Sequence, residues 1–509
     1  MGIIIRQSIK GTIANYIGIA VGFVTTFFVL TKYLTPEQVG LTRVLVDAAL
    51  LFSTLAQLGT GSSIVRYFPY FKDKESNHGL FFWSLVIPFV GFLIFLLLFF
   101  LFKSTIIQTF QDNSALFVNY FYFVIPIAFF MLYTTVFEVN ATILERIAVP
   151  KFIREVVIRC CLLAGYILFG LDVISLDGLV IVFCATYGLA ALLNLFYLLR
   201  SGRVSFKPDF KHITRELRRN FLLYTLFMIV TAVVSSAIPT LSSFFISAEQ
   251  GLAFAGIYAI ANYISAVVEV PYRSLSAIVQ PHISLSIKEQ DIPKATQYCQ
   301  KVALHQFLAG SFIFLVIWMN IDLFFMILPN GSSYAAGKWA VFILCMTKLV
   351  NSSFGIGGSA LGYTKYYAFS LLFTVVLMAS SITLNAWLVP VMNINGGALA
   401  TLISYTFYYA ILLAFVQKKV GTTPFSWGLL KVLAIILLIY GLNLLCYFFS
   451  THMIHIDNLS LLWKLVEAAV RTLLVSLVGV LLVLKWNVSP EIDDIYSRLF
   501  RKTRSHQGE

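Results

Sequence analysis

Long apolar runs separated by short polar segments dominate the chain. A helix needs about 20 residues to cross roughly 30 Å of hydrocarbon. Read against turn residues and charges, the apolar runs predict fourteen membrane-spanning helices, at residues 11–31, 41–67, 80–102, 117–139, 153–171, 178–199, 221–246, 253–280, 302–328, 336–360, 367–390, 396–416, 429–450 and 463–484. We therefore predict an all-α integral membrane protein with about fourteen transmembrane helices.

The composition excludes a soluble protein. Of the 509 residues, 59% are hydrophobic and only 12% are charged, whereas soluble domains carry about 25% charged residues. The net charge of +13 comes from basic residues in short connections between apolar runs. Because this is the positive-inside pattern of membrane proteins, it does not indicate a nucleic-acid partner.

The distribution of basic residues predicts the orientation. One set of connections, which includes both termini, holds 26 of the 36 Lys and Arg residues. The opposite connections hold only Lys32, Lys103, Lys338 and Lys464. Since Lys and Arg concentrate in cytoplasmic loops, we expect both the N- and the C-terminus in the cytoplasm.

Two repeated patterns divide the predicted helices. Glu37-Gln38 lies 32 positions before Pro69, and Glu249-Gln250 lies 32 positions before Pro281. A second pair, residues 177–187 and 395–405, relates the sixth and twelfth spans. The repeats predict two pseudo-symmetric six-helix lobes with a substrate path between them.

We expect five parts along the chain, in the order N-terminal lobe, basic cytoplasmic linker, C-terminal lobe, appended helices 13 and 14, and cytoplasmic tail. Their residues are 1–199, 200–220, 221–417, 418–485 and 486–509. The linker is open to two interpretations: a topology determinant, or a short amphipathic helix on the anionic inner leaflet.

Motifs for catalysis and metal binding are missing from the sequence. There is no G-x-x-x-x-G-K-[ST], no H-E-x-x-H and no G-x-S-x-G, so neither ATP coupling within this chain nor hydrolysis is expected. The six cysteines have no metal-ligand spacing and are predicted to be small buried hydrophobic residues. We expect no enzyme activity, no metal site and no bound cofactor.

Charged residues inside the predicted spans are the main candidates for function. A charge near the middle of a bilayer costs about 2.5–3.5 kcal/mol on insertion scales, so such residues usually face a polar interior. Arg43 and Asp47 are four residues apart, as are Glu269 and Arg273 with Pro271 between them. Each pair is open to two interpretations, a structural clip between helix turns or part of a polar cavity.

If the repeat-related second and eighth spans face the cleft between the lobes, they would line a net-cationic cavity. Such a cavity favours an anionic headgroup, and a diphosphate suits the planar donor fork of Arg. The predicted cavity residues are Arg43, Asp47, Gln57, Arg66, Glu269, Arg273 and Lys348. We expect Arg146, Arg154 and Arg159 at the cytoplasmic entrance. Asp47 and Glu269 are candidates for coupling to protons or sodium.

Three segments resemble the polysaccharide flippase branch of the multidrug/oligosaccharidyl-lipid/polysaccharide exporter superfamily. They are residues 10–15 (K-G-T-I-A-N), 33–40 (Y-L-T-P-E-Q-V-G) and 385–405 (N-A-W-L-V-P-V-M-N-I-N-G-G-A-L-A-T-L-I-S-Y). The last is similar to the family pattern N-x-x-L-I-P-x-x-G-I-x-G-A-A-x-A-T. It departs from that pattern at Asn393, which stands where the family usually has glycine.

The resemblance implies export of an undecaprenyl-pyrophosphate-linked oligosaccharide across a bacterial inner membrane by alternating access. It implies membrane lipids, the lipid-linked glycan, and a polysaccharide polymerase or assembly machinery as partners. Three other functions stay open: a cation-coupled multidrug exporter, a membrane glycosyltransferase and a non-transporting assembly scaffold. Twelve spans and an acidic cavity would favour the drug exporter, and a large outer loop would favour the transferase.

Overall fold

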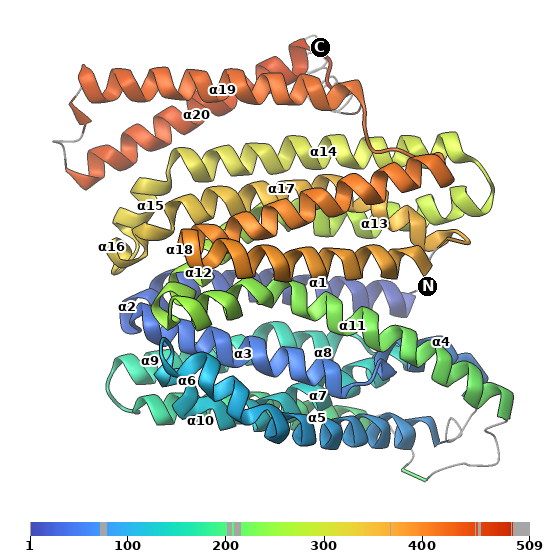
Figure 1. Ribbon diagram of the computed structural model, residues 1–509. Helices are drawn as coiled ribbons and strands as arrows, with labels where there is room; N and C mark the ends of the chain where they lie inside the picture. The colour runs from blue at the N-terminus through green and yellow to red at the C-terminus, as the bar shows by residue number, and fades with distance from the viewer. Residues whose placement is uncertain are drawn as a thin grey trace, which may run out of the picture. The chain divides into compact units, whose positions relative to one another are not determined.

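The computed structural model describes residues 2–71, 79–200, 206–207, 215–366, 368–453, 455–456, 460–489 and 491. Within these residues every regular element is a helix (Figure 1). Twelve helices are long and apolar enough to cross a membrane. The prediction of an all-α, multi-pass membrane protein is therefore confirmed, whereas the count of fourteen spans and the cytoplasmic termini stay predictions. Most of the predicted linker and tail lies outside the described residues.

Two parts of the chain account for the difference between the fourteen predicted spans and the twelve helices that are long and apolar enough to cross a membrane. The predicted spans 367–390 and 396–416 form α18 (Ala368–Lys419), which is interrupted at Asn393 with φ 53° and ψ −131°. At 1.5 Å per residue, 52 residues would extend about 78 Å, more than twice the hydrocarbon thickness. The positive φ also explains why a glycine suits this position.

The predicted span 153–171 is built from two short helices, the π-helix η4 (Ile153–Val157) and α9 (Ile158–Gly170), and a third short helix, α8 (Ala148–Phe152), comes directly before them. This stretch carries Lys151, Arg154, Glu155 and Arg159, and it is not among the twelve apolar helices.

The chain packs as two compact units. Unit 1 comprises Met1–Ile260, Leu328–Gly337 and Thr374–Ala400, and unit 2 comprises Ala261–Ile327, Lys338–Phe373 and Thr401–Glu509. The predicted boundaries at 199, 220, 417 and 485 stay predictions.

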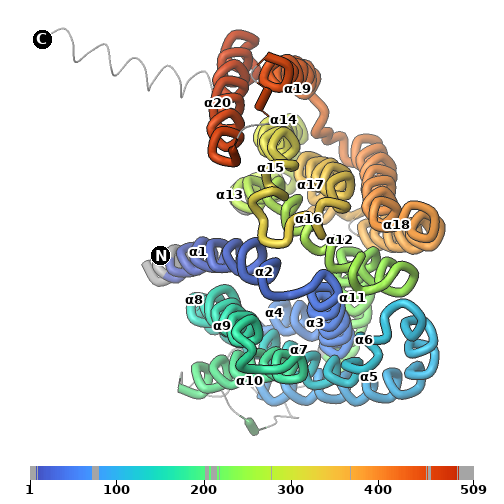
Figure 2. The backbone as a smooth tube through the Cα atoms, turned by 90° about the vertical axis from the view of Figure 1, so that its left-hand side faces the viewer, coloured from blue at the N-terminus to red at the C-terminus, as the bar shows by residue number. Residues whose placement is uncertain are grey.

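Unit 1 is a bundle in which α3 has a central place. α3 packs against α5, α7 and α11, while α10 packs against α7 and α9, as Figure 2 shows end-on. α8 and η4 pack against α1. The bounds of the longer helices are α1 (Gly2–Val24), α3 (Pro36–Ala56), α4 (Thr60–Phe71), α5 (Leu80–Gln111), α6 (Ala115–Tyr120), α7 (Val124–Ile143), α10 (Leu176–Arg200), α11 (Arg215–Glu249) and α12 (Leu252–Ser265).

The start and the end of α3 follow from local sequence. Thr35 caps the helix, because its hydroxyl accepts from the Gln38 amide while the Gln38 side chain accepts from the Thr35 amide. The helix ends where Leu58 and Gly59 take φ values of 50° and 66°. The predicted span 41–67 lies within the apolar stretch Pro36–Phe71, which is long enough to cross a membrane, but the helix in it is interrupted. Two residues with left-handed backbone conformation interrupt the helical hydrogen bonds between α3 and α4, so α4 is a separate helix.

Two glycines bring repeat-related helices into direct backbone contact in unit 1. Gly40 is the fifth residue of α3 and Gly256 is the fifth of α12. A Cβ added to Gly40 would overlap the carbonyl oxygen of Leu252, and one added to Gly256 would overlap that of Pro36. The contact is reciprocal, so the second and eighth predicted spans cross through equivalent positions.

Unit 2 places α14 (Ile292–Met319) against α13 (Val270–Lys288), α17 (Lys338–Ser359) and α19 (Trp427–His452). α19 pairs with α20 (Leu461–Lys485), as Figure 1 shows. A core that includes Val432, Ile435 and Val475 joins this pair to Leu315 of α14.

The segment that follows α20 is held to α14 by side chains. Lys301 Nζ lies 2.6 Å from Glu491 Oε1, and the Ser489 hydroxyl donates to the same carboxylate at 2.7 Å. His305 Nε2 is 2.9 Å from the Ser489 hydroxyl. The hydrogen bond from Lys301, followed by that from Ser489, lowers the pKa of Glu491 from 4.5 to about 2.

This depressed pKa predicts how the contact responds to pH. A carboxylate with a lowered folded-state pKa stabilises the fold above its unfolded pKa, and the contribution disappears as pH falls toward 2. We expect Glu491→Gln to lower the free energy of unfolding by less than about 1 kcal/mol, equally at pH 5 and pH 8. Thermal unfolding of both proteins from pH 2 to pH 8 checks this, and a difference that grows toward acid pH would contradict it.

Candidate functional site

The buried carboxylate of α3 is paired on its own helix. Arg43 Nε lies 2.8 Å from Asp47 Oδ2, as the spacing of four residues predicts. Asp47 is 2% exposed, whereas the Arg43 side chain is 21% exposed. The buried charge is thus matched by a cation that still reaches the surface of unit 1.

Gln57 and Arg66 flank the break between α3 and α4. The Gln57 carbonyl accepts from the Thr60 hydroxyl at 2.6 Å, which stabilises the turn between the helices. Arg66 is exposed on α4, and its guanidinium lies 4.1 Å from the ring centroid of Tyr224 on α11. This cation–π contact joins α4 to α11. Arg66 therefore lies on a different helix from Arg43, beyond the break that separates α3 from α4.

In unit 2, Glu269 is the centre of a polar cluster. It lies at the end of the 3-10 turn η5 (Ala266–Glu269), directly before α13. Asn351 Nδ2 donates to Glu269 Oε1 at 2.8 Å, and the Tyr409 hydroxyl donates to Asn351 Oδ1 at 2.6 Å. Lys348 Nζ is 3.7 Å from Glu269 Oε2. The cluster joins η5, α17 and α18.

The structure corrects the predicted pairing of Glu269 with Arg273. Arg273 is exposed on α13, and among the described residues it has no ion-pair partner. The physical reason is that Glu269 belongs to a 3-10 turn at the helix junction, from which its carboxylate reaches Asn351 and Lys348 on α17.

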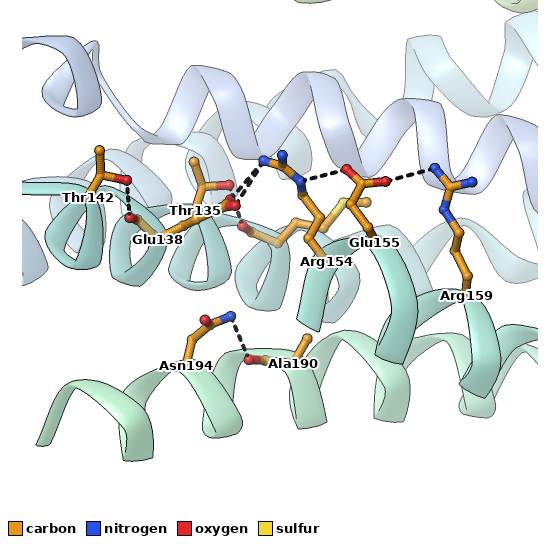
Figure 3. A network of polar contacts seen from close by, with 9 residues as sticks. Thr135, Glu138, Thr142, Arg154, Glu155, Arg159, Ala190 and Asn194 are labelled. Carbon is orange, nitrogen blue, oxygen red and sulfur yellow. Dashed lines mark hydrogen bonds and ion pairs between the residues drawn. The ribbon is translucent and has the colours of Figure 1, made fainter. Parts of the chain in front are cut away.

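Two of the three predicted entrance arginines belong to a network in unit 1, shown in Figure 3. Arg154 Nη1 lies 2.9 Å from Glu138 Oε1 of α7, and its Nε lies 3.3 Å from Glu155. Glu155 also contacts Arg159 Nη2 at 3.0 Å, so two acids and two bases alternate.

The network extends to α1. Arg159 Nη1 donates to the Gly18 carbonyl at 2.7 Å, and a Cβ on Gly18 would meet the backbone of Glu155. Because the four side chains neutralise one another, an anionic headgroup would have to compete with Glu138 and Glu155 for these arginines. Arg146, the third predicted entrance residue, is half-buried after α7 and outside this network.

The predicted residues thus fall into separate groups: Arg43 with Asp47, Gln57 and Arg66 around the helix break, and Glu269 with Lys348. Arg273 belongs to neither ion pair. Sequence reasoning did not find Asn351, Tyr409 and Tyr224, which are neutral residues in apolar spans and carry no charge pattern. Among the described residues, no group of three or more His, Cys, Asp or Glu could hold a metal ion.

A family model described as "Polysaccharide biosynthesis protein" matches residues 5–284, more than half of the chain. No curated protein sequence matches the chain.

Solved structures of membrane transporters share the fold. The lipid II flippase MurJ in an inward closed conformation has a TM-score of 0.73 at 14% identity, covering 97% of this chain and 99% of that one. An inward-facing multidrug resistance MATE family transporter of the MOP superfamily has a TM-score of 0.63 at 14% identity, covering 81% and 98%. A MOP superfamily transporter from Pyrococcus furiosus, described as having a binding pocket of reverse polarity, has a TM-score of 0.56 at 14% identity, covering 82% and 95%.

Proposed function

Because this chain belongs to the polysaccharide biosynthesis protein family, we propose that it is a flippase for a lipid-linked oligosaccharide. It would move an undecaprenyl-pyrophosphate-linked glycan across a bacterial inner membrane by alternating access.

The fold likeness to the lipid II flippase is the observation that carries this proposal. It extends over 97% of this chain, compared with 81% for the inward-facing multidrug transporter. It therefore supports a large amphiphilic substrate over a small drug. A drug exporter and a non-transporting assembly scaffold are the alternative functions, and the experiment below distinguishes a flippase from both because neither would move the glycan.

The charged groups support an anionic headgroup. Arg273 is exposed without an acidic partner among the described residues, and the Lys348 side chain is 25% exposed beside Glu269. Arg binds phosphate oxygens through two parallel N–H donors, whereas Lys acts as a point charge. We propose that Arg273 holds the diphosphate and that Lys348 adds the second positive charge.

The finer features of the mechanism are part of the same proposal. They are fourteen spans with both termini in the cytoplasm, two lobes that rock around a central cationic cavity, and an entrance lined by Arg146, Arg154 and Arg159. Arg43, Gln57 and Arg66 would line the other wall. Coupling to protons or sodium at Asp47 or Glu269, and a polymerase or assembly partner, stay predictions.

Replacing Arg273 with alanine tests the headgroup contact in cells. We expect a strain that lacks the gene to accumulate lipid-linked glycan in the inner leaflet. Complementation with Arg273→Ala should restore export about tenfold less well than the wild-type gene, the equivalent of about 1.4 kcal/mol of lost binding. An impermeant glycan-oxidising probe that labels only the outer leaflet measures the distribution.

Arg218→Ala is the matched control, because Arg218 is also an exposed arginine but lies at the start of α11. Complementation with Arg218→Ala should restore glycan export to the wild-type level. If the glycan reaches the outer leaflet without the gene, or if Arg273→Ala rescues as well as Arg218→Ala, the proposal is wrong.

A further inference from the structure

The amide of Asn351 is fixed between two partners in unit 2. Its Oδ1 accepts from the Tyr409 hydroxyl at 2.6 Å, and this contact turns Nδ2 toward Glu269, to which it donates at 2.8 Å. Gly355, one turn further along α17, leaves room for the hydroxyls of Tyr272 and Tyr409, since a Cβ there would lie 2.9 Å and 3.3 Å from them. The backbone thus makes space for this chain of hydrogen bonds.

The ion pair at the end of this chain is long. Lys348 Nζ lies 3.7 Å from Glu269, whereas charge-assisted hydrogen bonds usually measure about 2.7–2.9 Å. A second intramembrane pair of unit 2, Arg471 with Glu467, measures 2.9 Å. Lys348 is therefore held near Glu269 without a short hydrogen bond, while the other oxygen of Glu269 is bound firmly by Asn351.

We propose that Glu269 is a positioning residue that competes with the substrate for Lys348. Between transport cycles, Glu269 neutralises the Lys348 ammonium. When a substrate phosphate arrives, the Lys348 ammonium leaves the Glu269 carboxylate and binds the phosphate. The hydrogen bonds from Tyr409 to Asn351 and from Asn351 to Glu269 hold the carboxylate in place, so that it does not move with the ammonium. When the substrate leaves, the ion pair forms again and favours its release. This inference rests on the proposed function and names a phosphate group as the ligand of Lys348.

Exchange between two anions explains why a long pair suits this position. A short, bidentate pair would have to be broken at full cost before the substrate binds, and an ammonium without any counter-charge would hold the phosphate too tightly. The long ion pair between Lys348 and Glu269 keeps the free energies of two states close: Lys348 paired with Glu269, and Lys348 bound to the phosphate. Two variants of this cluster should therefore move substrate binding in opposite directions.

Glu269→Gln removes the competitor and retains the shape. We expect its apparent KM for lipid-linked glycan to fall about fivefold and its maximal flipping rate to fall about fivefold, because binding and release are both affected. Asn351→Ala frees the carboxylate to approach Lys348, so KM should rise about fivefold. Tyr409→Phe should shift KM in the same direction as Asn351→Ala, by a smaller factor.

The experiment measures initial flipping rates in proteoliposomes against the mole fraction of a labelled lipid-linked glycan. Glu467→Gln is the matched control, because Glu467 and Glu269 have similar side-chain exposures of 15% and 13% and each pairs with one base. It should leave KM unchanged. A purely structural role of the cluster would instead weaken binding, or leave it unchanged, in every variant.

The outcomes separate this inference from the proposed function. If the wild-type protein does not flip the glycan, the proposed function is wrong. If the wild-type protein flips it but KM of Glu269→Gln is unchanged or higher, the positioning role is wrong. Should Glu269→Gln fail to fold, unchanged KM values for Asn351→Ala and Tyr409→Phe would also overturn the inference.

Discussion

Replacing Asp47 with alanine is expected to destabilise the protein by about 3 kcal/mol. Removing one partner of a buried ion pair costs roughly 3–5 kcal/mol, because it leaves a charge without its counter-ion. Asp47 is 2% exposed, but the Arg43 side chain is 21% exposed, so the lower end of that range applies. Unfolding in mixed detergent micelles with increasing SDS measures the change.

The double variant Arg43→Met/Asp47→Leu separates a structural clip from a functional pair. Apolar side chains of similar volume often replace a buried pair without loss of stability. We expect the double variant to regain most of the stability lost in Asp47→Ala. If the pair belongs to the cavity, flipping stays low in the folded double variant, and full flipping would show that the pair is only a clip.

Alanine at Gly40 or Gly256 should have the second large effect. Each new Cβ would overlap a backbone carbonyl of the other helix, and a backbone cannot move aside as a flexible side chain can. The crossing of α3 and α12 must therefore open, at a cost of about 1–3 kcal/mol for each substitution. The same SDS titration measures this cost.

Gly441 of α19 is the control for these glycines. Among the described residues, no atom outside the local backbone of α19 lies within 4 Å of a Cβ built there. Since alanine is favoured over glycine in a helix by up to about 1 kcal/mol, Gly441→Ala should stabilise the protein or leave it unchanged. Destabilisation of the same size at Gly441 and Gly40 would contradict the close crossing.

The helices could be predicted from the sequence because apolar length determines membrane spans almost alone. The break at Leu58 and Gly59 could not, because Leu58 in the left-handed region has no sequence pattern. Asn393 is an intermediate case. Its departure from the family's glycine was visible in the sequence, but only the structure shows the positive φ behind it.

The candidate site was predictable where partners lie on one helix. The pair of Arg43 with Asp47 follows from a spacing of four residues, and it forms. The same reasoning was wrong for Glu269 and Arg273, because a 3-10 turn changes the direction of the carboxylate and a lysine on another helix takes the place of the arginine. Asn351 and Tyr409 reach Glu269 through tertiary packing, and periodicity within one helix contains no information about such contacts.

Transfer of a labelled lipid-linked glycan in proteoliposomes that contain only this protein tests the central claim most directly. An impermeant glycan-oxidising reagent outside the vesicles reports how much glycan faces outward over time. The account predicts transfer that is faster than in protein-free vesicles and about tenfold slower with Arg273→Ala. Equal rates with and without the wild-type protein would contradict it.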